Sequence, residues 1–591
     1  MSAPKKCNGI RFVAGAALLL GAACAANAAP GPAYDLLIRG GTIYDGSGGA
    51  PYIGDVAVRH DRIAYVGPHR PLKATKVVDA RGLAVSPGFI NMLSWSNESL
   101  LVDPRGQSEL RQGVTLEVMG EGWSMGPYTP TMKKLAVQRE GDIKYPITWT
   151  TLGEYLNFLE RKGTSLNVAS FVGATTVRQH ELGERNVDPT PDQLRRMRAL
   201  VRQAMQEGAL GVGSSLIYPP ATFAKTDELV ALTSEAARCG GMYISHMRSE
   251  GDRLLESIDE LVEISRRSGA PAEIYHFKQA GRSNWSKLDP AIARVDAARA
   301  AGLKITADLY TYTAGSTGLA TSMPPWVQDG GNEAMLQRLK DPAVVERIKR
   351  EMLQPGRDWE NLYLHAGPDG VELTNLIDPS LKPLIGKTVG EVAKLRHTTP
   401  EQAVIDIVLA DRGRSGAVYF LMNEDNVRRE AGIPWMSFGS DAEAAAPEGV
   451  FLKSSTHPRA YGNFARFLGK YVRDEKVTSL QDAIRRLTSL PASNLKLRDR
   501  GRLAPGMAAD VVTFDPATIA DHSTYANPMQ YATGVRDVFV NGVQVLKSGE
   551  PTGASSGRFV KGPGWTGWPG GGACKAATVT RIPRGATESE R

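Results

Sequence analysis

The sequence of 591 residues has few cysteines, a small net charge and no internal repeats. Each of these features excludes a class of protein. Four cysteines are too few for a small disulfide-stapled scaffold. The net charge is +7, but Lys5, Lys6 and Arg11 contribute three of these charges near the N-terminus, which leaves +4 for the rest of the chain. Basic residues elsewhere are interspersed with acidic ones, so we expect no nucleic-acid partner. A composition of 42% hydrophobic and 23% charged residues predicts a globular protein with a large buried core.

The N-terminal segment has the pattern of an export signal. Its three basic residues precede an apolar run over residues 12–23, and Ala26-Asn27-Ala28 offers a cleavage site of the A-x-A type. We expect residues 1–28 to be a signal peptide and the protein to be exported, either periplasmic or secreted. The apolar run is shorter than the roughly 20 residues that a spanning helix needs, so no stable membrane span is predicted. A retained anchor and a lipoprotein remain alternatives, although Gly21 weakens the lipobox that ends at Cys24.

Two of the four cysteines, Cys7 and Cys24, lie in the expected signal. Of the other two, Cys239 falls in a predicted core turn and Cys574 in the tail. A bridge between them is possible in principle, but nothing in the sequence supports it. We therefore expect Cys239 to be a free buried thiol.

Two β-rich, glycine-punctuated stretches flank a long central region. They lie within residues 29–84 and 500–551, and their short alternating strands predict one small β-domain built from both flanks. The tail, residues 552–591, is rich in Gly, Ser and Pro and is expected to be loose. The central region, residues 85–499, alternates apolar strands with helical patterns, which is typical of parallel α/β architecture.

The number of strands in the central region distinguishes a closed barrel from an open sheet. Eight candidates are present, at residues 87–91, 115–119, 167–172, 211–214, 242–245, 272–275, 304–309 and 435–440. Helical patterns lie between several of them, at 191–206, 226–238 and 254–268. Eight strands predict an α/β fold of the (β/α)₈ TIM-barrel type, whose active site lies at the C-terminal strand ends. The stretch near 316–432 is too long for a loop, so we expect an insertion that covers the site, the alternative being a peripheral insertion without function.

Ionisable residues cluster where four of these strands end. Glu121 follows the second strand, His246 the fifth, His276 the sixth and Asp441 the eighth. Either histidine alone could be structural, but two imidazoles and two carboxylates at one barrel mouth predict a zinc site with nitrogen and oxygen ligands. Bound Zn²⁺ lowers the pKa of a water from about 16 to roughly 7, and Asp441 is placed to orient that water and transfer its proton. We therefore expect hydrolysis without a covalent intermediate and without a serine nucleophile.

Other polar residues near the same rim could bind a substrate carboxylate. They are Lys278, Arg459 in His457-Pro-Arg, and either Tyr310 or Tyr312. Arginine suits this role because its planar guanidinium binds a carboxylate through two hydrogen bonds. We expect a small-molecule substrate with a carboxylate, while a surface or structural role for each residue remains the alternative.

The sequence resembles the amidohydrolase superfamily and, within it, the D-aminoacylase (N-acyl-D-amino-acid deacylase) family. The similar segments extend over most of the chain after the signal and read DLLIRGGTIYDG from Asp35, VSPGFI from Val85, IYPP from Ile217, SHMRSE from Ser245, IYHFK from Ile274, GSD from Gly439 and LAPGMAADVV from Leu503. The resemblance implies a metal-dependent barrel beside a small β-domain, with His246 and His276 as zinc ligands and Asp441 as the catalytic acid and base.

The same resemblance implies an N-acyl-D-amino acid as substrate, with Lys278, Tyr310 and Arg459 holding its α-carboxylate. The sequence leaves open the acyl group, the amino-acid side chain, the stereochemical preference and the oligomeric state. Two other functions stay possible at this point. One is hydrolysis of dipeptides, cyclic amides or other acyl amides, and the other is ligand binding without catalysis.

Two motifs of the family are altered in this chain. The family's H-x-H pair is absent, with Leu93 and Trp95 at its positions, so a second metal is not expected there. The segment that supplies a cysteine ligand reads Gly120-Glu-Gly-Trp-Ser with one residue deleted, which places Glu121 at the cysteine position. A carboxylate can replace a thiolate on zinc. We therefore expect one Zn²⁺ ion, held by Glu121, His246 and His276.

Overall fold

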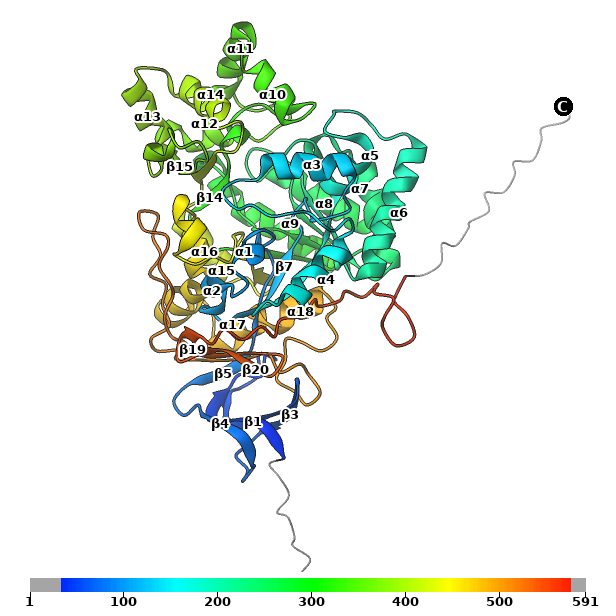
Figure 1. Cartoon of the computed structure of the whole chain (residues 1–591), viewed down its shortest axis with the longest axis vertical. Helices are drawn as coiled ribbons and strands as arrows, with labels where there is room; N and C mark the ends of the chain where they lie inside the picture. Colours follow the sequence, from blue (N-terminus) through cyan, green and yellow to red (C-terminus); the bar gives the residue numbers. More distant parts are fainter. Residues whose placement is uncertain (1–32, 575–591) are drawn as a thin grey trace, which may run out of the picture.

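The computed structural model describes residues 33–574, and the expected signal lies outside this range. Three parts follow one another along the longest axis of the molecule (Figure 1). A small β-domain built from the blue and the orange-red ends of the described chain lies at the bottom, the barrel lies in the middle, and a mainly helical insertion in green lies at the top. No helix among the described residues combines the length and the apolar character that crossing a membrane requires.

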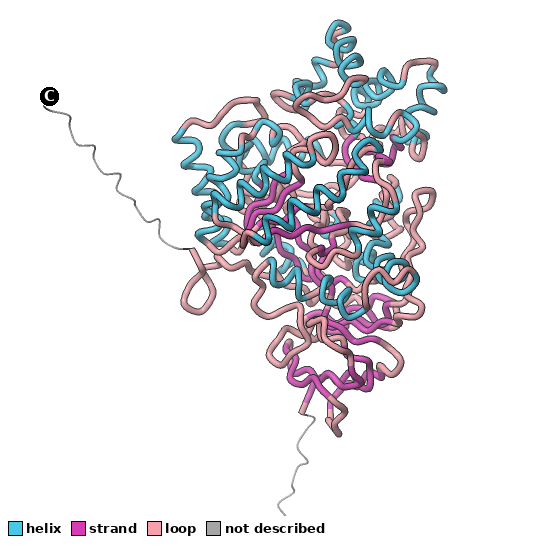
Figure 2. Tube along the Cα trace, turned by 180° about the vertical axis from the view of Figure 1, so that it is seen from behind, coloured by secondary structure: helices cyan, strands magenta, loops and turns pink. Residues whose placement is uncertain are grey.

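Within residues 33–574, eight parallel strands form a closed barrel. Figure 2 shows strands in the middle of the molecule and helices around them. The strands are β6 (Phe89–Asn91), β7 (Val114–Met119), β8 (Asn167–Ser170) with its continuation β9 (Val172–Gly173), β10 (Gly211–Ser215), β11 (Met242–His246), β12 (Ala272–Ile274), β13 (Ile305–Leu309) and β17 (Met436–Phe438). The ring closes where Met92 N, after β6, donates a hydrogen bond of 3.0 Å to Phe438 O of β17. All residues of β7 are buried, as expected for parallel strands covered on both faces. The eight predicted strands and the predicted barrel fold are confirmed.

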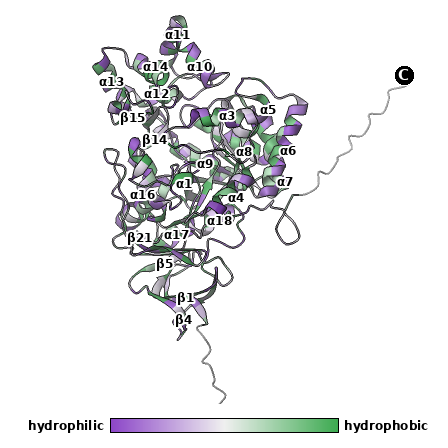
Figure 3. Cartoon of the chain, viewed as in Figure 1, coloured by the Kyte–Doolittle hydropathy of each residue, from purple (hydrophilic) through white to green (hydrophobic). Residues whose placement is uncertain are grey.

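Helices cover the outside of the barrel, and most of them bury apolar residues on one face, so they show both hydrophobic and hydrophilic colours in Figure 3. They are α1 (Ser99–Val102), α2 (Gln107–Leu110), α3 (Pro130–Arg139), α4 (Leu152–Lys162), α5 (Ala174–Leu182), α6 (Pro191–Glu207), α7 (Thr226–Arg238), α8 (Leu254–Ser268), α9 (Leu288–Ala300), α15 (Glu424–Ala431), α16 (Arg459–Arg466), α17 (Leu480–Leu487) and α18 (Ser489–Asn494). Local sequence sets their ends. At the start of α6, Thr190 and Gln193 form a reciprocal capping pair, and Gly208 adopts the left-handed conformation that ends the helix.

The two flanks of the barrel combine into one nine-stranded sheet. Its strands are β1 (Tyr34–Ile43), β2 (Tyr52–Arg59), β3 (Arg62–Gly67), β4 (Ala74–Asp79), β5 (Ala84–Pro87), β18 (Val511–Phe514), β19 (Val535–Val540), β20 (Val543–Lys547) and β21 (Glu550–Pro551). Strand β5 joins the flanks, because it pairs with β1 on one side and with β18 on the other. The small β-domain is therefore a single unit that both ends of the described chain share.

The segment after β21 is ordered as far as residue 574, which corrects the expectation of a loose tail for this part. Val560 N donates a hydrogen bond of 2.9 Å to Val168 O in β8, and the side chain of Phe559 is buried. Cys574 forms a disulfide with Cys239, 335 residues earlier. The prediction that Cys239 is a free buried thiol was wrong, because a bond between such distant residues leaves no local pattern in the sequence.

The long excursion between β13 and β17 forms a compact unit with its own hydrophobic core. It contains a three-stranded sheet of β14 (Ala314–Gly318), β15 (Val371–Asn375) and β16 (Gly416–Phe420), and the helices α10 (Asn332–Arg338), α11 (Pro342–Met352), α12 (Leu362–Ala366), α13 (Val389–Arg396) and α14 (Pro400–Ala410). The small β-domain lies at the opposite end of the barrel (Figure 1). The chain thus leaves the barrel after β13 and enters the insertion at β14.

Removing the disulfide is expected to destabilise the fold and to leave the barrel mouth intact. In Cys574→Ser the free energy of unfolding should fall by about 2–5 kcal/mol, because the cross-link restricts the unfolded chain. Urea unfolding followed by tryptophan fluorescence measures the change. Cys239→Ser and the reduced native protein serve as controls and should unfold at the same midpoint as Cys574→Ser, and a midpoint equal to that of the oxidised native protein would contradict the stabilising role.

Candidate metal centre and active site

The residues predicted for the site lie at the C-terminal ends of four barrel strands and face one cavity. Glu121 follows β7, His246 ends β11, His276 follows β12 and Asp441 follows β17. All four line a cavity of about 1330 Å³. Residues of the insertion, among them Thr317 of β14, complete its wall. The barrel and the insertion together therefore enclose the predicted site.

Glycines on both sides of Glu121 allow its loop to enter the barrel mouth. Gly120 and Gly122 both have positive φ values, of 105° and 70°. A Cβ atom on Gly120 would lie 2.3 Å from Phe171 O, and one on Gly122 would lie 1.9 Å from Ser215 Oγ. Only glycine fits these two positions, so the Gly-Glu-Gly sequence is what brings the carboxylate close to the histidines.

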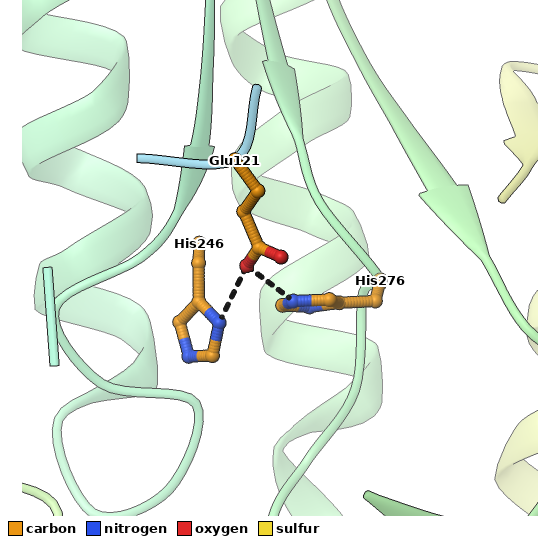
Figure 4. Close-up of side chains that lie close together, drawn as sticks. All are labelled: Glu121, His246 and His276. Carbon is orange, nitrogen blue, oxygen red and sulfur yellow. Dashed lines mark hydrogen bonds and ion pairs between the residues drawn. The ribbon is translucent and has the colours of Figure 1, made fainter. Parts of the chain in front are cut away.

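Glu121 contacts both histidines through one carboxylate oxygen (Figure 4). Its Oε1 lies 3.0 Å from His246 Nδ1 and 3.1 Å from His276 Nε2. One potential ligand atom from each of the three buried residues lies within 4.8 Å of the others. Two imidazole nitrogens and one carboxylate oxygen are the type and number of protein ligands that catalytic zinc sites use. The residues therefore fit a bound metal ion.

The contact between Glu121 and His276 is ionic. Burial opposes the charge on Glu121, but its hydrogen bonds with His246 and His276 outweigh burial and lower its pKa to about 2. Burial and the neighbouring Lys278 oppose a charge on His276, but the carboxylates of Glu250 and Glu121 raise its pKa to about 10. A metal ion that binds here must displace the proton from this imidazole, because a ligating histidine is neutral.

Asp441 is held from two sides beside the predicted metal ligands. Trp95 Nε1 donates hydrogen bonds of 3.0 Å to Asp441 Oδ1 and 3.1 Å to Glu121 Oε2. Arg459 Nη1 lies 2.7 Å from Asp441 Oδ2. Asp441 has a φ of 50°, in the sparsely populated left-handed region, and its backbone N–H donates to Leu93 O at 2.9 Å. Such strain is typical of residues whose position matters for function.

The environment of Asp441 favours proton uptake. Burial raises its pKa, the cation of Arg459 lowers it, and the nearby carboxylate of Glu121 raises it, with a net upward shift. A raised pKa brings a carboxylate closer to the range in which it can accept and return a proton during a reaction. Asp441 can thus act as a general acid and base.

The positions of the missing H-x-H pair offer no metal ligand in this structure. Leu93 is fully buried in the hydrophobic core. Trp95 directs its indole N–H at the two carboxylates, and an indole N–H only donates hydrogen bonds. Trp95 therefore bridges Glu121 and Asp441 directly.

Of the three residues expected to bind a carboxylate, Arg459 and Tyr310 contact each other at the cavity. Arg459 is 3% exposed, lines the cavity, and its Nε makes no hydrogen bond within residues 33–574. Its guanidinium lies over the ring of Tyr310, 4.5 Å from the centroid. Lys278 also lines the cavity, but its Nζ lies 2.6 Å from Glu250 Oε1 and is engaged there. Tyr312 is not part of this group, because its hydroxyl donates to Asp521.

Three further residues of the site went unassigned in the sequence. Glu250 lies against both histidines and Lys278. His457 accepts the N–H of Arg459 on Nδ1 and donates to Ala314 O from Nε2, which fixes the start of α16. The third is Trp95. Glu250 follows His246 by four residues within the SHMRSE segment, but this stretch is a loop, so no periodic pattern predicts which way the side chain points.

A G-x-S-x-G pattern at residues 122–126 raises a serine nucleophile as an alternative. Ser124 Oγ donates to Gly126 O at 2.6 Å and accepts from Gly173 N at 2.9 Å. It is buried, and neither of these partners is a base. Ser124 therefore braces the loop and is not arranged as a nucleophile.

Replacing Gly122 with alanine is expected to displace Glu121 and to weaken metal binding by about 10–100-fold, the loss typical when ligand positioning is disturbed. The added Cβ would collide with Ser215 Oγ. Gly183→Ala is the matched control, since Gly183 has a similar φ of 67° but open space around it. Competition with a chromophoric chelator measures both affinities. Equal metal affinity in the two variants would show that the close packing around Gly122 does not set the position of Glu121.

Comparison with known proteins identifies the family. The model of the amidohydrolase family matches residues 384–546. The chain is 30% identical to the D-aminoacylase of Alcaligenes xylosoxydans xylosoxydans over 531 residues, which are 89% of this chain and 97% of that protein. It is also 30% identical to the N-acyl-D-glutamate deacylase of the same organism, over 88% of this chain and 95% of the relative.

Solved structures agree. A crystal structure of D-aminoacylase superposes with a TM-score of 0.73 at 30% identity, covering 89% of this chain and 100% of that one. The N-acyl-D-glutamate deacylase from Bordetella bronchiseptica, in complex with zinc and a phosphonate inhibitor, gives a TM-score of 0.71 at 28% identity, covering 89% and 99%. A D-hydantoinase from Thermus sp., at 13% identity and a TM-score of 0.51, shares the fold. The chain belongs to the D-aminoacylase family of amidohydrolases, which are hydrolases of carbon–nitrogen bonds other than peptide bonds.

Proposed function

We propose that this protein hydrolyses the amide bond of N-acyl-D-amino acids and uses one zinc ion for the reaction. The relatives named D-aminoacylase, N-acyl-D-glutamate deacylase and N-acyl-D-aspartate deacylase support this substrate class. The ligand set of Glu121, His246 and His276 supports zinc, since nitrogen and carboxylate ligands in a group of three are typical of its catalytic sites. The absence of ligands at Leu93 and Trp95 supports a single ion.

One observation carries the proposal. Three metal-ligand side chains, the acid–base candidate Asp441 and the carboxylate-binding candidate Arg459 line the same cavity. Asp441 lies between the metal-ligand group and Arg459, since Trp95 links one of its oxygens to Glu121 and its other oxygen contacts Arg459. A site that only bound a ligand would not need a proton-transfer group between its metal ligands and its anion-binding group.

The chain's own groups then divide the reaction between them. Glu121, His246 and His276 would hold the zinc ion, which would supply a water of lowered pKa and an electrophile for the amide carbonyl. Asp441 can accept the proton of the attacking water and return it to the leaving amine. Trp95 holds one oxygen of Asp441 in place, so the other oxygen accepts the proton once it is released from Arg459.

Substrate binding provides that release. Within residues 33–574, Arg459 Nε makes no hydrogen bond and Nη1 contacts Asp441 Oδ2, so a substrate carboxylate that accepts from both nitrogens takes the place of Asp441 at Nη1. The guanidinium packs against the face of the Tyr310 ring. As Arg459 turns to the substrate, its hold on Asp441 loosens and the carboxylate becomes free to act as a base.

We further propose that the protein works outside the cytoplasm. The signal-like pattern of residues 1–28 motivates this assignment. The Cys239–Cys574 disulfide supports it, because such bonds persist in oxidising compartments. Cell fractionation with an antibody against the protein tests the assignment, and recovery only with cytoplasmic markers would contradict it.

The decisive experiment measures zinc content and deacylation on the same samples of native protein, His246→Ala and Asp441→Asn. The native protein should hold one zinc per chain and hydrolyse members of a panel of N-acyl-D-amino acids, with the L-enantiomers as controls. His246→Ala should lose zinc and activity together. Asp441→Asn should keep zinc while kcat falls by about 10²–10⁴-fold, the usual contribution of general acid–base catalysis.

Other results of the same experiment point elsewhere. Zinc without turnover of any amide would favour a relative that binds ligands without catalysis. Turnover of dipeptides or cyclic amides, without turnover of acyl-D-amino acids, would support the proposed metal centre and contradict the proposed substrate. Two zinc ions per native chain would contradict the single-ion proposal.

Replacing Arg459 with alanine is expected to raise KM for acyl-amino acids by about 10–100-fold, the loss typical of a hydrogen bond to a charged group. The acid limb of the pH–rate profile should also move to higher pH, because the cation of Arg459 lowers the pKa of Asp441 and its loss lets that pKa rise. Arg412→Ala is the control, since Arg412 lines the same cavity but pairs with Glu333 in the insertion. An unchanged KM in Arg459→Ala would remove this residue from substrate recognition.

A further inference from the structure

Glu250 lies behind the two histidines, on the side opposite to Glu121. It belongs to the loop that follows β11, and its side chain is buried. Its Oε1 lies 2.9 Å from His276 Nδ1, and its Oε2 lies 3.6 Å from His246 Nε2. Glu121 contacts the other nitrogen of each ring. Each imidazole is therefore placed between two carboxylates.

This arrangement separates the four ring nitrogens into two pairs. His246 Nδ1 and His276 Nε2 face Glu121, on the side of the metal ligands. A neutral imidazole that binds a metal through one nitrogen carries its proton on the other. The protons must then be on His246 Nε2 and His276 Nδ1, and these are the two nitrogens that face Glu250.

Glu250 is the acceptor that the structure provides for both protons. Its 2.9 Å contact with His276 Nδ1 is a hydrogen-bond distance. His246 Nε2 is buried and has no hydrogen bond within residues 33–574, and Glu250 Oε2 at 3.6 Å is the carboxylate oxygen beside it. One carboxylate can thus serve both rings, with one oxygen for each.

The position of Glu250 is fixed from several directions. Its backbone N–H donates to Glu360 Oε2 of the insertion at 2.8 Å, and its carbonyl accepts from Ala280 N at 2.8 Å. Lys278 Nζ lies 2.6 Å from its Oε1 and supplies the compensating charge. The carboxylate of Glu250 is therefore a hydrogen-bond acceptor in a fixed place, paired with the ammonium of Lys278.

Lys278 can contact either Glu250 or His276. Its Nζ lies 2.7 Å from His276 Nδ1 as well as 2.6 Å from Glu250 Oε1. When His276 Nδ1 carries a proton, the ammonium can no longer donate to it and retains only the carboxylate. In the tautomer that binds metal, Lys278 therefore contacts Glu250 and not His276. This contact links the lysine to the metal ligands through Glu250.

We propose that Glu250 is a positioning residue that selects the metal-binding tautomer of both His246 and His276, with Lys278 as its counter-ion. The inference rests on the proposed function only for the choice of metal. Removing Glu250 leaves the three ligands in place but removes the preference for protons on the far nitrogens. Metal affinity should fall for that reason, and the geometry of the substrate-binding groups Arg459 and Tyr310 should not change.

The test compares zinc affinity in the native protein, Glu250→Gln and Glu273→Gln by chelator competition. Glu250→Gln should bind zinc about 10–100-fold more weakly, the range observed when a carboxylate behind a histidine ligand is lost. Glu273→Gln is the matched control, since Glu273 is an equally buried barrel glutamate whose carboxylate contacts Thr306, Ser437 and Asn494 instead of the histidines. Its zinc affinity should equal that of the native protein.

A second measurement reads the tautomers directly. In the zinc-loaded protein with ¹⁵N-labelled histidine, NMR should show His246 protonated on Nε2 and His276 on Nδ1, and the Glu250→Gln spectrum should lose at least one of these signals. Glu250→Asp, which keeps the carboxylate, should retain part of the affinity and replaces Glu250→Gln if the latter does not fold. Native zinc affinity with native tautomers in a folded Glu250 variant would overturn the proposal.

These readouts are independent of the substrate. If the native protein hydrolyses no acyl-amino acid but Glu250→Gln still loses zinc affinity, the proposed function fails and the role of Glu250 stands. If the native protein is active and Glu250→Gln binds zinc as tightly as it does, the role of Glu250 fails and the proposed function stands.

Discussion

The contact of Glu121 with His246 and His276 is the constraint around which the barrel mouth is arranged. It places a carboxylate between strands β7, β11 and β12, where two glycines let the backbone approach. Because three buried ionisable groups in contact need compensation, further charged and polar groups follow around them. Glu250 and Lys278 lie behind the histidines, and Trp95 connects Glu121 to Asp441. Every residue given a role in the proposed reaction is linked to this contact through one or two others.

The sequence predicted what regular patterns encode. The eight strands followed from their apolar runs, and the helices at 226–238 and 254–268 were predicted with the bounds of α7 and α8. Glu121, His246, His276 and Asp441 could be named because strand ends meet at one face of a barrel. Side-chain direction within loops has no such pattern, so the contacts of Glu250 and Trp95 needed the structure. The disulfide and the ordered segment 552–574 depend on contacts between distant parts of the chain, which composition does not reveal.

Trp95 illustrates how a family site can change its chemistry without losing its shape. The resemblance places a histidine at this position, where it would be a metal ligand. Here an indole fills the position and donates to Glu121 and Asp441 from one nitrogen. A metal ion and an N–H group share the ability to hold two carboxylates near each other, since both present positive charge to them. The indole therefore keeps Glu121, which stands at the family's cysteine position, beside Asp441, although the indole itself cannot bind a metal.

The insertion has a hydrophobic core separate from that of the barrel, yet its residues form part of the cavity wall. His246 ends a barrel strand, and Glu121, His276 and Asp441 follow barrel strands, whereas Thr317 and other residues of the cavity wall belong to the insertion. A substitution inside the insertion can be accommodated by its own packing without moving a strand of the barrel. The range of substrates and the reaction chemistry are therefore free to evolve at different rates in this chain, although the two units are joined at several points, among them the hydrogen bonds from Glu250 N to Glu360 Oε2 and from Gly281 N to Leu421 O.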